Sequence, residues 1–457
     1  MSTHAAVILA AGKGTRMNSQ TPKVLHRVCG TEMLCLVEIA ARQAGLGPIA
    51  VVVPSDSQQI ESALGSDVSY VTQEEQLGTG HAVLQAEEVL KSADNVLVMY
   101  GDVPLVAAQT LKQMMKLHDD TEACITLLTS KLVNPDGLGR IIRDSSGSVT
   151  AIIEEQDADA ETKAIREINS GFYCFRAAWL WKHLNGLPPS RKGEVFLTDL
   201  VALAAKQGMQ VESVLSEDAY EVMGVNNRVQ MAEAENVMRQ RIRENWMMEG
   251  VSMPDPSSVY IDHTVKLGQD TVILPNTHLT GRTLVGIACR IGPNSMISDS
   301  IIGDRCGVLS SVIRDSHLGD RVDVGPFSHI RGGSHLESGV HVGTSAEIKN
   351  SHLGPDTKMG HFSYMGDAHL GSNVNIGAGA ITCNFDGENK NETHIGDDVF
   401  VSCDTMLIAP VTMGDRSSTG AGAVVTKDVA ADSLVVGVPA KEFPKKPKLD
   451  LDKEPSS

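Results

Sequence analysis

The second half of this 457-residue chain carries a six-residue repeat, and no other feature limits its fold as strongly. An apolar side chain, or Thr419 in one place, recurs at Leu318, Val324, Ile330, Leu336, Val342 and Ile348 and at Ile395, Val401, Leu407, Met413, Thr419 and Val425. This period is typical of the hexapeptide parallel β-helix. Three units close one triangular coil, and coils stack roughly 4.8 Å apart to bury their apolar positions. The repeat therefore predicts a β-helix over about residues 260–437.

The first half lacks this repeat and alternates apolar runs with helical stretches. Residues 5–9, 49–53 and 96–100 have the apolar character of buried parallel strands, and polar or glycine-rich turns follow them. This pattern predicts an α/β sheet that binds ligands at the carboxyl ends of its strands. Residues 228–250 contain no proline, and no glycine before Gly250, so we predict a connecting helix there.

Charge and cysteine content exclude several classes of protein. The formal net charge of −18 argues against a duplex nucleic-acid binder, which normally presents a basic face. The eight cysteines are scattered without a C-x-x-C pair, so we predict reduced thiols rather than disulfides or a zinc site. The apolar run at residues 5–11 is too short to span a bilayer, and no signal-peptide pattern is present. We therefore expect a cytoplasmic protein without membrane partners.

A glycine-rich loop, Leu9-Ala-Ala-Gly-Lys-Gly-Thr-Arg16, follows the first predicted strand, and Thr21-Pro-Lys23 lies shortly downstream. Its glycines let backbone N–H groups approach a phosphate chain, while Arg16 and Lys23 neutralise charge. The loop is neither a Walker A sequence nor the three-glycine dinucleotide pattern. The full string resembles the sugar-nucleotidyltransferase family.

That resemblance implies a nucleotide site and a metal site. Asp102 ends an apolar strand, and Asn226 would be its partner as a metal ligand; this oxygen pair suits Mg²⁺. The alternative for Asp102 is a turn or helix-capping aspartate. The resemblance gives Lys23 and Arg16 catalytic roles. The implied nucleotide and sugar-nucleotide contacts are Leu9, Ala10, Ala11, Gly12, Gly14, Lys23, Gln73, Gly78, Thr79, Tyr100, Gly101, Asp102, Gly139, Glu154, Asn169 and Asn226. The implied reaction is attack of a sugar-1-phosphate oxygen on the α-phosphate of UTP, with pyrophosphate leaving.

The second half contains a separate set of candidate residues centred on His361. From residue 5 to about 437, the chain resembles the bacterial bifunctional N-acetylglucosamine-1-phosphate uridylyltransferase/glucosamine-1-phosphate acetyltransferase family, which has the same order of residues around this histidine. The resemblance implies that His361 is the general base for attack of the glucosamine amine on acetyl-CoA. It implies sugar-phosphate contacts from Arg331, Lys349, Tyr364, Asn375 and Lys390. It implies acetyl-CoA contacts from Ala378, Asn384, Phe385, Cys403 and Ala421.

Three positions depart from the family pattern. Cys403 replaces a common serine, Phe385 a frequent tyrosine and Gly437 an arginine found in many members. All three lie at the implied coenzyme site, so they bear on affinity for acetyl-CoA. The segment 383–394 interrupts the six-residue repeat, as expected of a functional loop inserted into a solenoid.

These features predict an α/β plus all-β protein in four parts. They are a Rossmann-like uridylyltransferase domain (1–227), a linker helix (228–250), a left-handed hexapeptide β-helix acetyltransferase domain (251–440) and a disordered tail (441–457). The resemblance implies a homotrimer formed through the β-helix, with UTP, acetyl-CoA and glucosamine-1-phosphate as substrates. One alternative is a single-activity nucleotidyltransferase whose β-helix serves only oligomerisation or regulation. Another is a non-catalytic regulator that binds sugar nucleotides.

Four histidines precede the inward leucine of their units: His317, His335, His352 and His369. If five-residue units occur at 348–353 and 365–370, these side chains stack on one face, roughly 4.8 Å apart. We interpret this ladder as solvated and without a ligand. The alternative is a pH-sensitive seam, in which adjacent imidazolium ions repel and destabilise the fold as the pH falls.

Overall fold

The computed structural model describes residues 2–187 and 194–443, and the chain divides into two compact units. The first unit ends at Met238 and the second begins at Arg239, so the boundary falls within helix α9 (Arg228–Met248). This helix confirms the one predicted over residues 228–250. Among the described residues, no helix has both the length and the hydrophobicity needed to span a membrane.

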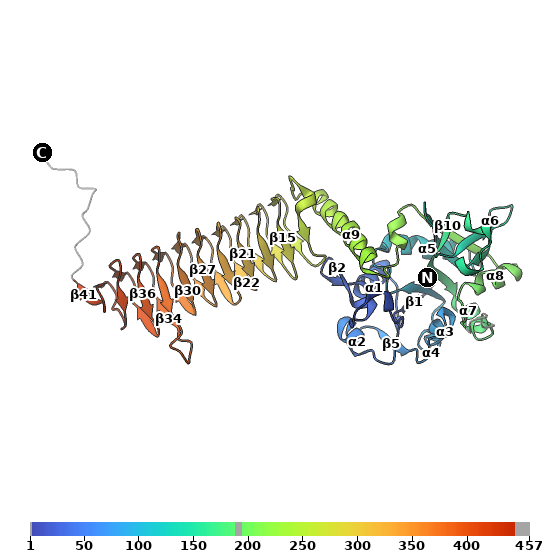
Figure 1. The fold of residues 1–457 in the computed structure, drawn as a ribbon, viewed down its shortest axis with the longest axis horizontal. Helices are drawn as coiled ribbons and strands as arrows, with labels where there is room; N and C mark the ends of the chain where they lie inside the picture. Colours follow the sequence, from blue (N-terminus) through green and yellow to red (C-terminus); the bar gives the residue numbers. More distant parts are fainter. Residues whose placement is uncertain (1, 188–193, 444–457) are drawn as a thin grey trace. The chain divides into compact units, whose positions relative to one another are not determined.

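The first unit is built on one mixed sheet, in which Figure 1 labels β1, β5 and β10. The strand order is β11-β7-β10-β6-β1-β4-β5, and the β8–β9 hairpin is attached to β10. The strands are β1 (His4–Leu9), β4 (Ile49–Val53), β5 (Ser69–Thr72), β6 (Asn95–Tyr100), β7 (Ile125–Lys131), β8 (Arg140–Arg143), β9 (Val149–Ile153), β10 (Glu167–Arg176) and β11 (Val211–Ser216). The three predicted buried strands are β1, β4 and β6, and β1 pairs in parallel with both of the others. Their carboxyl ends therefore meet at one edge of the sheet.

Helices cover both faces of this sheet because the buried strands are apolar on both sides. Ala6 and Ile8 of β1 pack into one core cluster, whereas Ala5 and Val7 pack into the other. The first cluster contains buried residues of α1 (Met33–Ala44), α2 (Gln58–Leu64) and α5 (Ala108–Asp120). The second contains those of α3 (Thr79–Leu84), α4 (Glu87–Leu90), α7 (Ala177–Leu184) and α8 (Asp199–Lys206). This is the layered arrangement predicted from the sequence.

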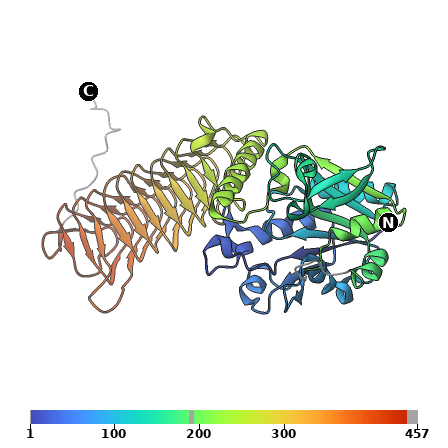
Figure 2. The same ribbon diagram turned by 45° about the vertical axis from the view of Figure 1, so that its right-hand side comes forward.

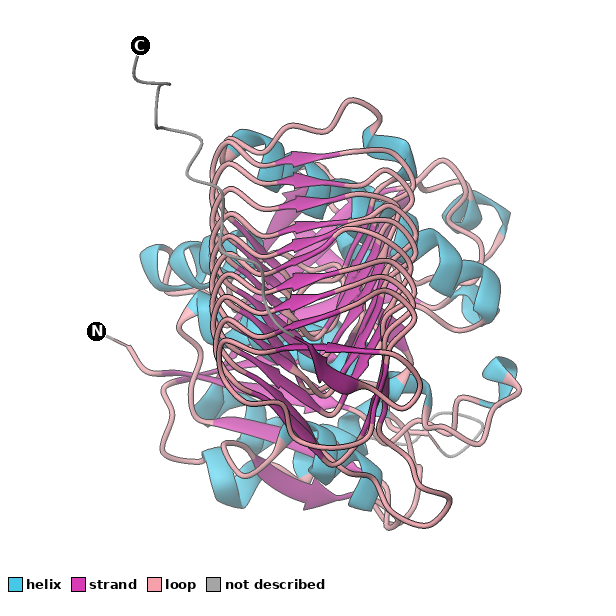
Figure 3. Ribbon diagram, turned by 90° about the vertical axis from the view of Figure 1, so that its left-hand side faces the viewer, coloured by secondary structure: helices cyan, strands magenta, loops and turns pink. Residues whose placement is uncertain are grey.

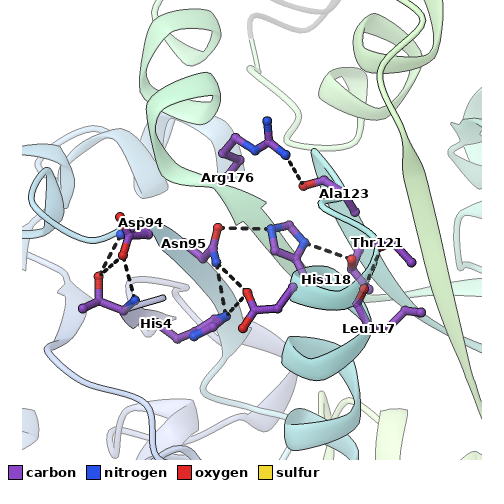
Figure 4. A network of polar contacts seen from close by, with 11 residues as sticks. His4, Asp94, Asn95, Leu117, His118, Thr121, Ala123 and Arg176 are labelled. Atoms are coloured by element: carbon purple, nitrogen blue, oxygen red, sulfur yellow. Dashed lines mark hydrogen bonds and ion pairs between the residues drawn. The ribbon is translucent and has the colours of Figure 1, made fainter. Parts of the chain in front are cut away.

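A buried polar network ties α5 to the sheet through His118 (Figure 4). The side chain is 2% exposed; its Nε2 lies 3.2 Å from Asn95 Oδ1, and its Nδ1 lies 2.9 Å from Thr126 Oγ1. Because the Asn95 amide nitrogen donates to Asp119, its oxygen accepts from His118. Burial, followed by the charge of His4, lowers the pKa of His118 to about 4. The ring is therefore neutral at physiological pH.

We expect His118 to make the stability of the first unit depend on pH. The unfolded chain titrates near the ordinary histidine pKa of 6.5, so it binds more protons than the folded chain between pH 6.5 and about 4. The stabilising contribution is complete above pH 6.5 and is lost as the pH falls to 4, by up to about 3 kcal/mol. Urea unfolding at several pH values should show a shallower slope for His118→Gln; equal slopes would contradict this origin.

The second unit is a three-sided, left-handed β-helix whose coils stack along its axis (Figure 3). We call its sides the first face (strands β12 to β39), the second face (β13 to β37) and the third face (β14 to β41). Every position of the predicted six-residue repeat is buried in one continuous core, and Thr419 is buried with them. The strands run from β12 (Tyr260–Ile261) to β41 (Lys441–Phe443), close to the predicted limits.

Two details of the β-helix bear on the predictions. The register pairs His317, His335, His352 and His369 in sequence, which confirms the five-residue units at 348–353 and 365–370. The predicted start of the tail at Lys441 is wrong, because β41 pairs antiparallel with β40 (Leu434–Val436) and so continues the third face. The remainder of the predicted tail, residues 444–457, lies outside the described residues.

Candidate functional sites

A cavity of about 360 Å³ opens at the carboxyl edge of the first unit's sheet. Its lining includes Leu9, Ala10, Ala11, Gly12, Lys23, Val24, Gln73, Gln76, Gly78, Thr79, Ala82, Tyr100, Asp102, Glu194 and Phe196. Gly101 ties β6 to β1, because its N–H donates to the Leu9 carbonyl at 3.0 Å. Gly14 has φ of +58°, and a Cβ there would lie 2.5 Å from the Cβ of Lys23. The glycine-rich loop thus wraps closely around Lys23.

Four polar side chains converge at this edge. The Lys23 ammonium contacts the Asp102 carboxylate and lies 3.2 Å from Asn226 Oδ1. Arg16 Nη2 donates to the same Asn226 oxygen at 2.8 Å. The side chains of Lys23 and Asp102 are only 13% and 16% exposed. One oxygen of Asp102 and one of Asn226 thus face the same Lys23 nitrogen, although the two residues are far apart in the sequence. The same two oxygens can therefore face one divalent cation.

Residues 73–81, which contain the predicted nucleotide contacts Gln73, Gly78 and Thr79, are held tightly against their surroundings. Gln73 is buried, with Nε2 3.3 Å from the Gly78 carbonyl and 3.1 Å from His81 Nδ1. Gly78 has φ of +101°, and a Cβ there would lie 2.5 Å from the Val195 carbonyl oxygen. Gln76 reaches across the cavity and donates to the Ala11 carbonyl at 2.6 Å. Gln76 was not predicted to contribute to this site, although it lies within this segment.

Three of the predicted sugar-nucleotide contacts, Gly139, Glu154 and Asn169, lie together beside the cavity. The Asn169 N–H donates to the Gly139 carbonyl at 2.9 Å, and a Cβ on Gly139 would lie 3.4 Å from Glu154 Oε2. Burial raises the pKa of the Glu154 carboxyl. Burial, followed by the charge of Asp102, raises the pKa of Tyr100, whose ring packs over Gly171. Tyr100 thereby connects this group to the cavity.

A cationic cluster occupies the first face of the β-helix. Arg331 of β24 (His329–Arg331), Lys349 of β27 (Glu347–Lys349) and Gly366 of β30 (Tyr364–Gly366) are paired in register. The neighbouring Lys390 ammonium lowers the pKa of Lys349. A Cβ on Gly366 would lie 2.2 Å from the Tyr364 hydroxyl, so the tyrosine lies across this position. The cluster provides the positive charge that a phosphate group requires.

Asp367 anchors the loop that carries two further candidates, Asn384 and Phe385, and no role was predicted for it from the sequence. Its Oδ1 accepts from Asn350 at 2.7 Å, and its Oδ2 accepts from Asn384. Burial raises the pKa of Asp367, but these hydrogen bonds and the charges of Lys349 and Lys390 bring it below the ordinary value. Asp367 therefore remains ionised and orients Asn384. The loop itself, residues 384–392, projects from the β-helix between β33 (Ile381–Cys383) and β34 (Thr393–Ile395) (Figure 2).

His361 lies on a corner of the β-helix, between the third and first faces. Backbone hydrogen bonds join this corner to the same corner of the following coils. The Gly379 N–H donates to the Phe362 carbonyl at 2.7 Å, and the Asp404 N–H donates to the Ala378 carbonyl at 2.7 Å. In the next coil, the Gly422 N–H donates to the Cys403 carbonyl at 2.9 Å. His361, Ala378, Cys403 and Ala421 therefore occupy one corner on successive coils. Asn375 lies on the adjoining third face in β32 (Asn375–Ile376). Asn384 and Phe385 come directly after β33, at the other edge of the first face. Within one chain, the predicted coenzyme contacts therefore lie at two different corners.

Comparisons with known proteins agree with this two-part arrangement. Residues 6–161 match the MobA-like NTP transferase domain. The chain is 45% identical to the Bifunctional protein GlmU of Heliobacterium modesticaldum, covering 95% of this chain and 96% of that one. It is 46% identical to the GlmU protein of Caldanaerobacter subterraneus, covering 94% of both chains. The chain belongs to the GlmU family. This confirms the family resemblance and, with it, the prediction of a bifunctional uridylyltransferase and acetyltransferase. The GlmU match also argues against the single-activity alternative, since it extends through both units.

Proposed function

We propose that the first unit transfers UMP from UTP to N-acetylglucosamine-1-phosphate, and that the second unit makes this substrate by acetylating glucosamine-1-phosphate with acetyl-CoA. The observation that carries the proposal is the convergence of Arg16 and Asn226 on Lys23 and Asp102, which line the cavity. Phosphoryl-type transfer depends on charge neutralisation and positioning, and this cluster supplies both. The acetyl group is added first, because the nucleotide site acts on the N-acetylated sugar.

Within the first unit, Asp102 and Asn226 would hold Mg²⁺. Their carboxylate and amide oxygens are hard ligands, and both already lie against the same cationic Lys23. When bound, Mg²⁺ would neutralise phosphate charge. Lys23 and Arg16 offset the remaining negative charge, while Gln73 and the Gly78 backbone face the base. Glu154 and Asn169 orient the sugar so that its phosphate oxygen lies in line with the α-phosphate.

Within the second unit, His361 takes a proton from the glucosamine amine as the nitrogen attacks the thioester carbonyl. The carbon–sulfur bond breaks, and the departing sulfur takes the proton from His361, so that coenzyme A leaves as the thiol. Arg331, Lys349 and Lys390 bind the sugar phosphate; Lys349 and Lys390 already contact each other, and a phosphate would relieve their repulsion. Ala378, Cys403 and Ala421 form the coenzyme corner that runs from His361.

We further propose a homotrimer assembled through the β-helix. The predicted coenzyme contacts lie on two corners of one chain, and side-by-side packing would bring unlike corners of neighbouring chains together. Exposed aromatic residues near these corners support such packing: Phe362 is 59% exposed and Phe385 is 60% exposed. None of the eight cysteines, all of which the structure describes, forms a disulfide, and this suits the reducing cytoplasm, where we place the protein.

Separated halves test the assembly. A fragment ending at Met238 should be monomeric and should uridylylate supplied N-acetylglucosamine-1-phosphate, because its core and cavity are complete. A fragment beginning at Arg239 should sediment as a trimer and retain acetyl transfer. A monomeric second fragment with full acetyl-transfer activity would contradict sites shared between chains.

A coupled assay tests the function itself. The purified protein would receive glucosamine-1-phosphate, acetyl-CoA, UTP and Mg²⁺, with free thiol and pyrophosphate followed separately. We expect thiol release without UTP, and pyrophosphate release from UTP only after acetylation or on addition of N-acetylglucosamine-1-phosphate. Pyrophosphate release without any thiol release would show that the second unit is not an acetyltransferase.

A further inference from the structure

The second face of the β-helix carries an uninterrupted column of histidines. The strand register places His394 directly after the four predicted members, so the column comprises His317, His335, His352, His369 and His394. The rings of His335 and His352 are stacked, with centroids 5.1 Å apart and an interplanar angle of 18°. The predicted ladder is therefore present, and it is one coil longer than expected.

A carboxylate lies against this column at two adjacent rings. Glu337 Oε1 is 3.3 Å from Nε2 of His335 and 3.8 Å from Nε2 of His352. The three ligand atoms all lie within 4.8 Å of one another. Glu337 follows the strand that contains His335, whereas His352 comes from the next coil. The fold thus directs the same ring nitrogen of two histidines toward one carboxylate oxygen.

We propose that His335, Glu337 and His352 bind a divalent transition-metal ion such as Zn²⁺ or Ni²⁺. Two imidazole nitrogens and one carboxylate oxygen suit these ions better than Mg²⁺ or Ca²⁺, which prefer oxygen ligands alone. Ligand atoms around tetrahedral Zn²⁺ are roughly 3.3 Å apart, given bonds of about 2.0–2.2 Å. The observed separations of 3.3 and 3.8 Å to Glu337 therefore require only a small side-chain adjustment.

The exposure of the three side chains also suits a bound ion. They are 38–42% exposed, so water can complete the coordination sphere while the backbone on either side stays fixed in the sheet. The arrangement recurs with His369, His394 and Glu392, at 3.9 and 3.3 Å. Those side chains are 52–61% exposed, and Glu392 comes from the projecting loop. Binding an ion there would therefore cost more conformational entropy of the side chains and the loop. We therefore assign the stronger site to His335, Glu337 and His352.

This site lies on the second face and is separate from both proposed reactions. The cationic cluster lies on the first face, and His361 lies on the corner between the third and first faces. A bound ion would join two successive coils of the β-helix. The sequence alone suggested a ladder without a ligand, because it did not show that Glu337 lies between two of its members.

The test is nickel binding to the full-length protein, purified without a histidine tag. Excess Mg²⁺ fills oxygen-ligand sites, and Cys403→Ser in every sample removes the exposed thiol. Isothermal titration with NiCl₂ should show one tight ion per chain. His352→Gln should weaken this binding by at least about tenfold, as should His335→Gln, because each removes a ligand. His369→Gln is the matched control from the same column, and it should leave the tight binding unchanged.

Ni²⁺ should also raise the melting temperature of the parent protein but not that of His352→Gln, provided that the two have matching circular dichroism without metal. Equal affinity in the parent and in both His335→Gln and His352→Gln would overturn the proposal. Loss of tight binding in His369→Gln, with retention in His352→Gln, would overturn the assignment to these three residues.

Discussion

Asp102→Ala should lower pyrophosphate release by at least roughly 10²–10³-fold, while thiol release from acetyl-CoA continues at the parent rate. The substitution removes the carboxylate that faces Lys23 and the proposed Mg²⁺, whereas the residues proposed for acetyl transfer all lie in the second unit. The two products would be measured separately, with N-acetylglucosamine-1-phosphate supplied for the uridylyl step.

Asp136→Ala provides a matched control, because Asp136 is an exposed aspartate of the same unit away from the cavity lining. It should retain both activities. If Asp102→Ala lost both activities while remaining folded, the assignment of one reaction to each unit would be wrong. If it kept pyrophosphate release, Asp102 would be only a turn residue.

His361→Ala should have the reverse effect, lowering acetyl transfer by roughly 10²–10⁴-fold, the usual contribution of a general base. Uridylyl transfer to supplied N-acetylglucosamine-1-phosphate should continue. His341→Ala is the control: this partly exposed histidine lies on the third face, 3.1 Å from Asp323, and has no proposed role. Equal acetyl transfer by the two variants would show that His361 is not the base.

The periodic parts of the fold were predictable because the spacing of apolar residues along the chain shows which positions are buried. The inward positions of the β-helix, the parallel strands β1, β4 and β6 and the helix α9 all follow from spacing and apolar character. The end of the β-helix was harder to predict. β41 pairs antiparallel with β40 and is exposed. It therefore lacks both the six-residue repeat and the buried apolar residues by which the other strands were predicted.

The candidate sites were predictable where they lie in ordered motifs, and not where they depend on contacts between distant segments. Phe196 and Glu194 line the cavity because Val195 between them hydrogen-bonds with Leu77 and Gly80, and no local pattern at 194–196 indicates this. Asp367 occupies a one-residue corner between two strands; only the structure shows that it receives hydrogen bonds from Asn350 and Asn384. Such roles depend on side-chain direction at a corner, which sequence spacing does not determine.

The structure shows where Cys403 and Phe385, two of the departures from the family pattern, lie on the β-helix. Cys403 is exposed on the corner that carries His361, Ala378 and Ala421, whereas Phe385 belongs to the projecting loop. The cysteine and phenylalanine substitutions therefore affect two different walls of the proposed coenzyme site.

The projecting loop leaves the β-helix after Cys383 and returns at Thr393, which pairs with Ala368 of the preceding coil. Both neighbouring strands keep their register, so the stacking does not depend on how many residues lie between them. Lengthening or shortening this segment would leave the stacked core intact and would move only the side chains that it carries, Asn384 and Lys390 among them. The β-helix thus provides a rigid support, and a change in the loop would reposition proposed substrate contacts without disturbing that support.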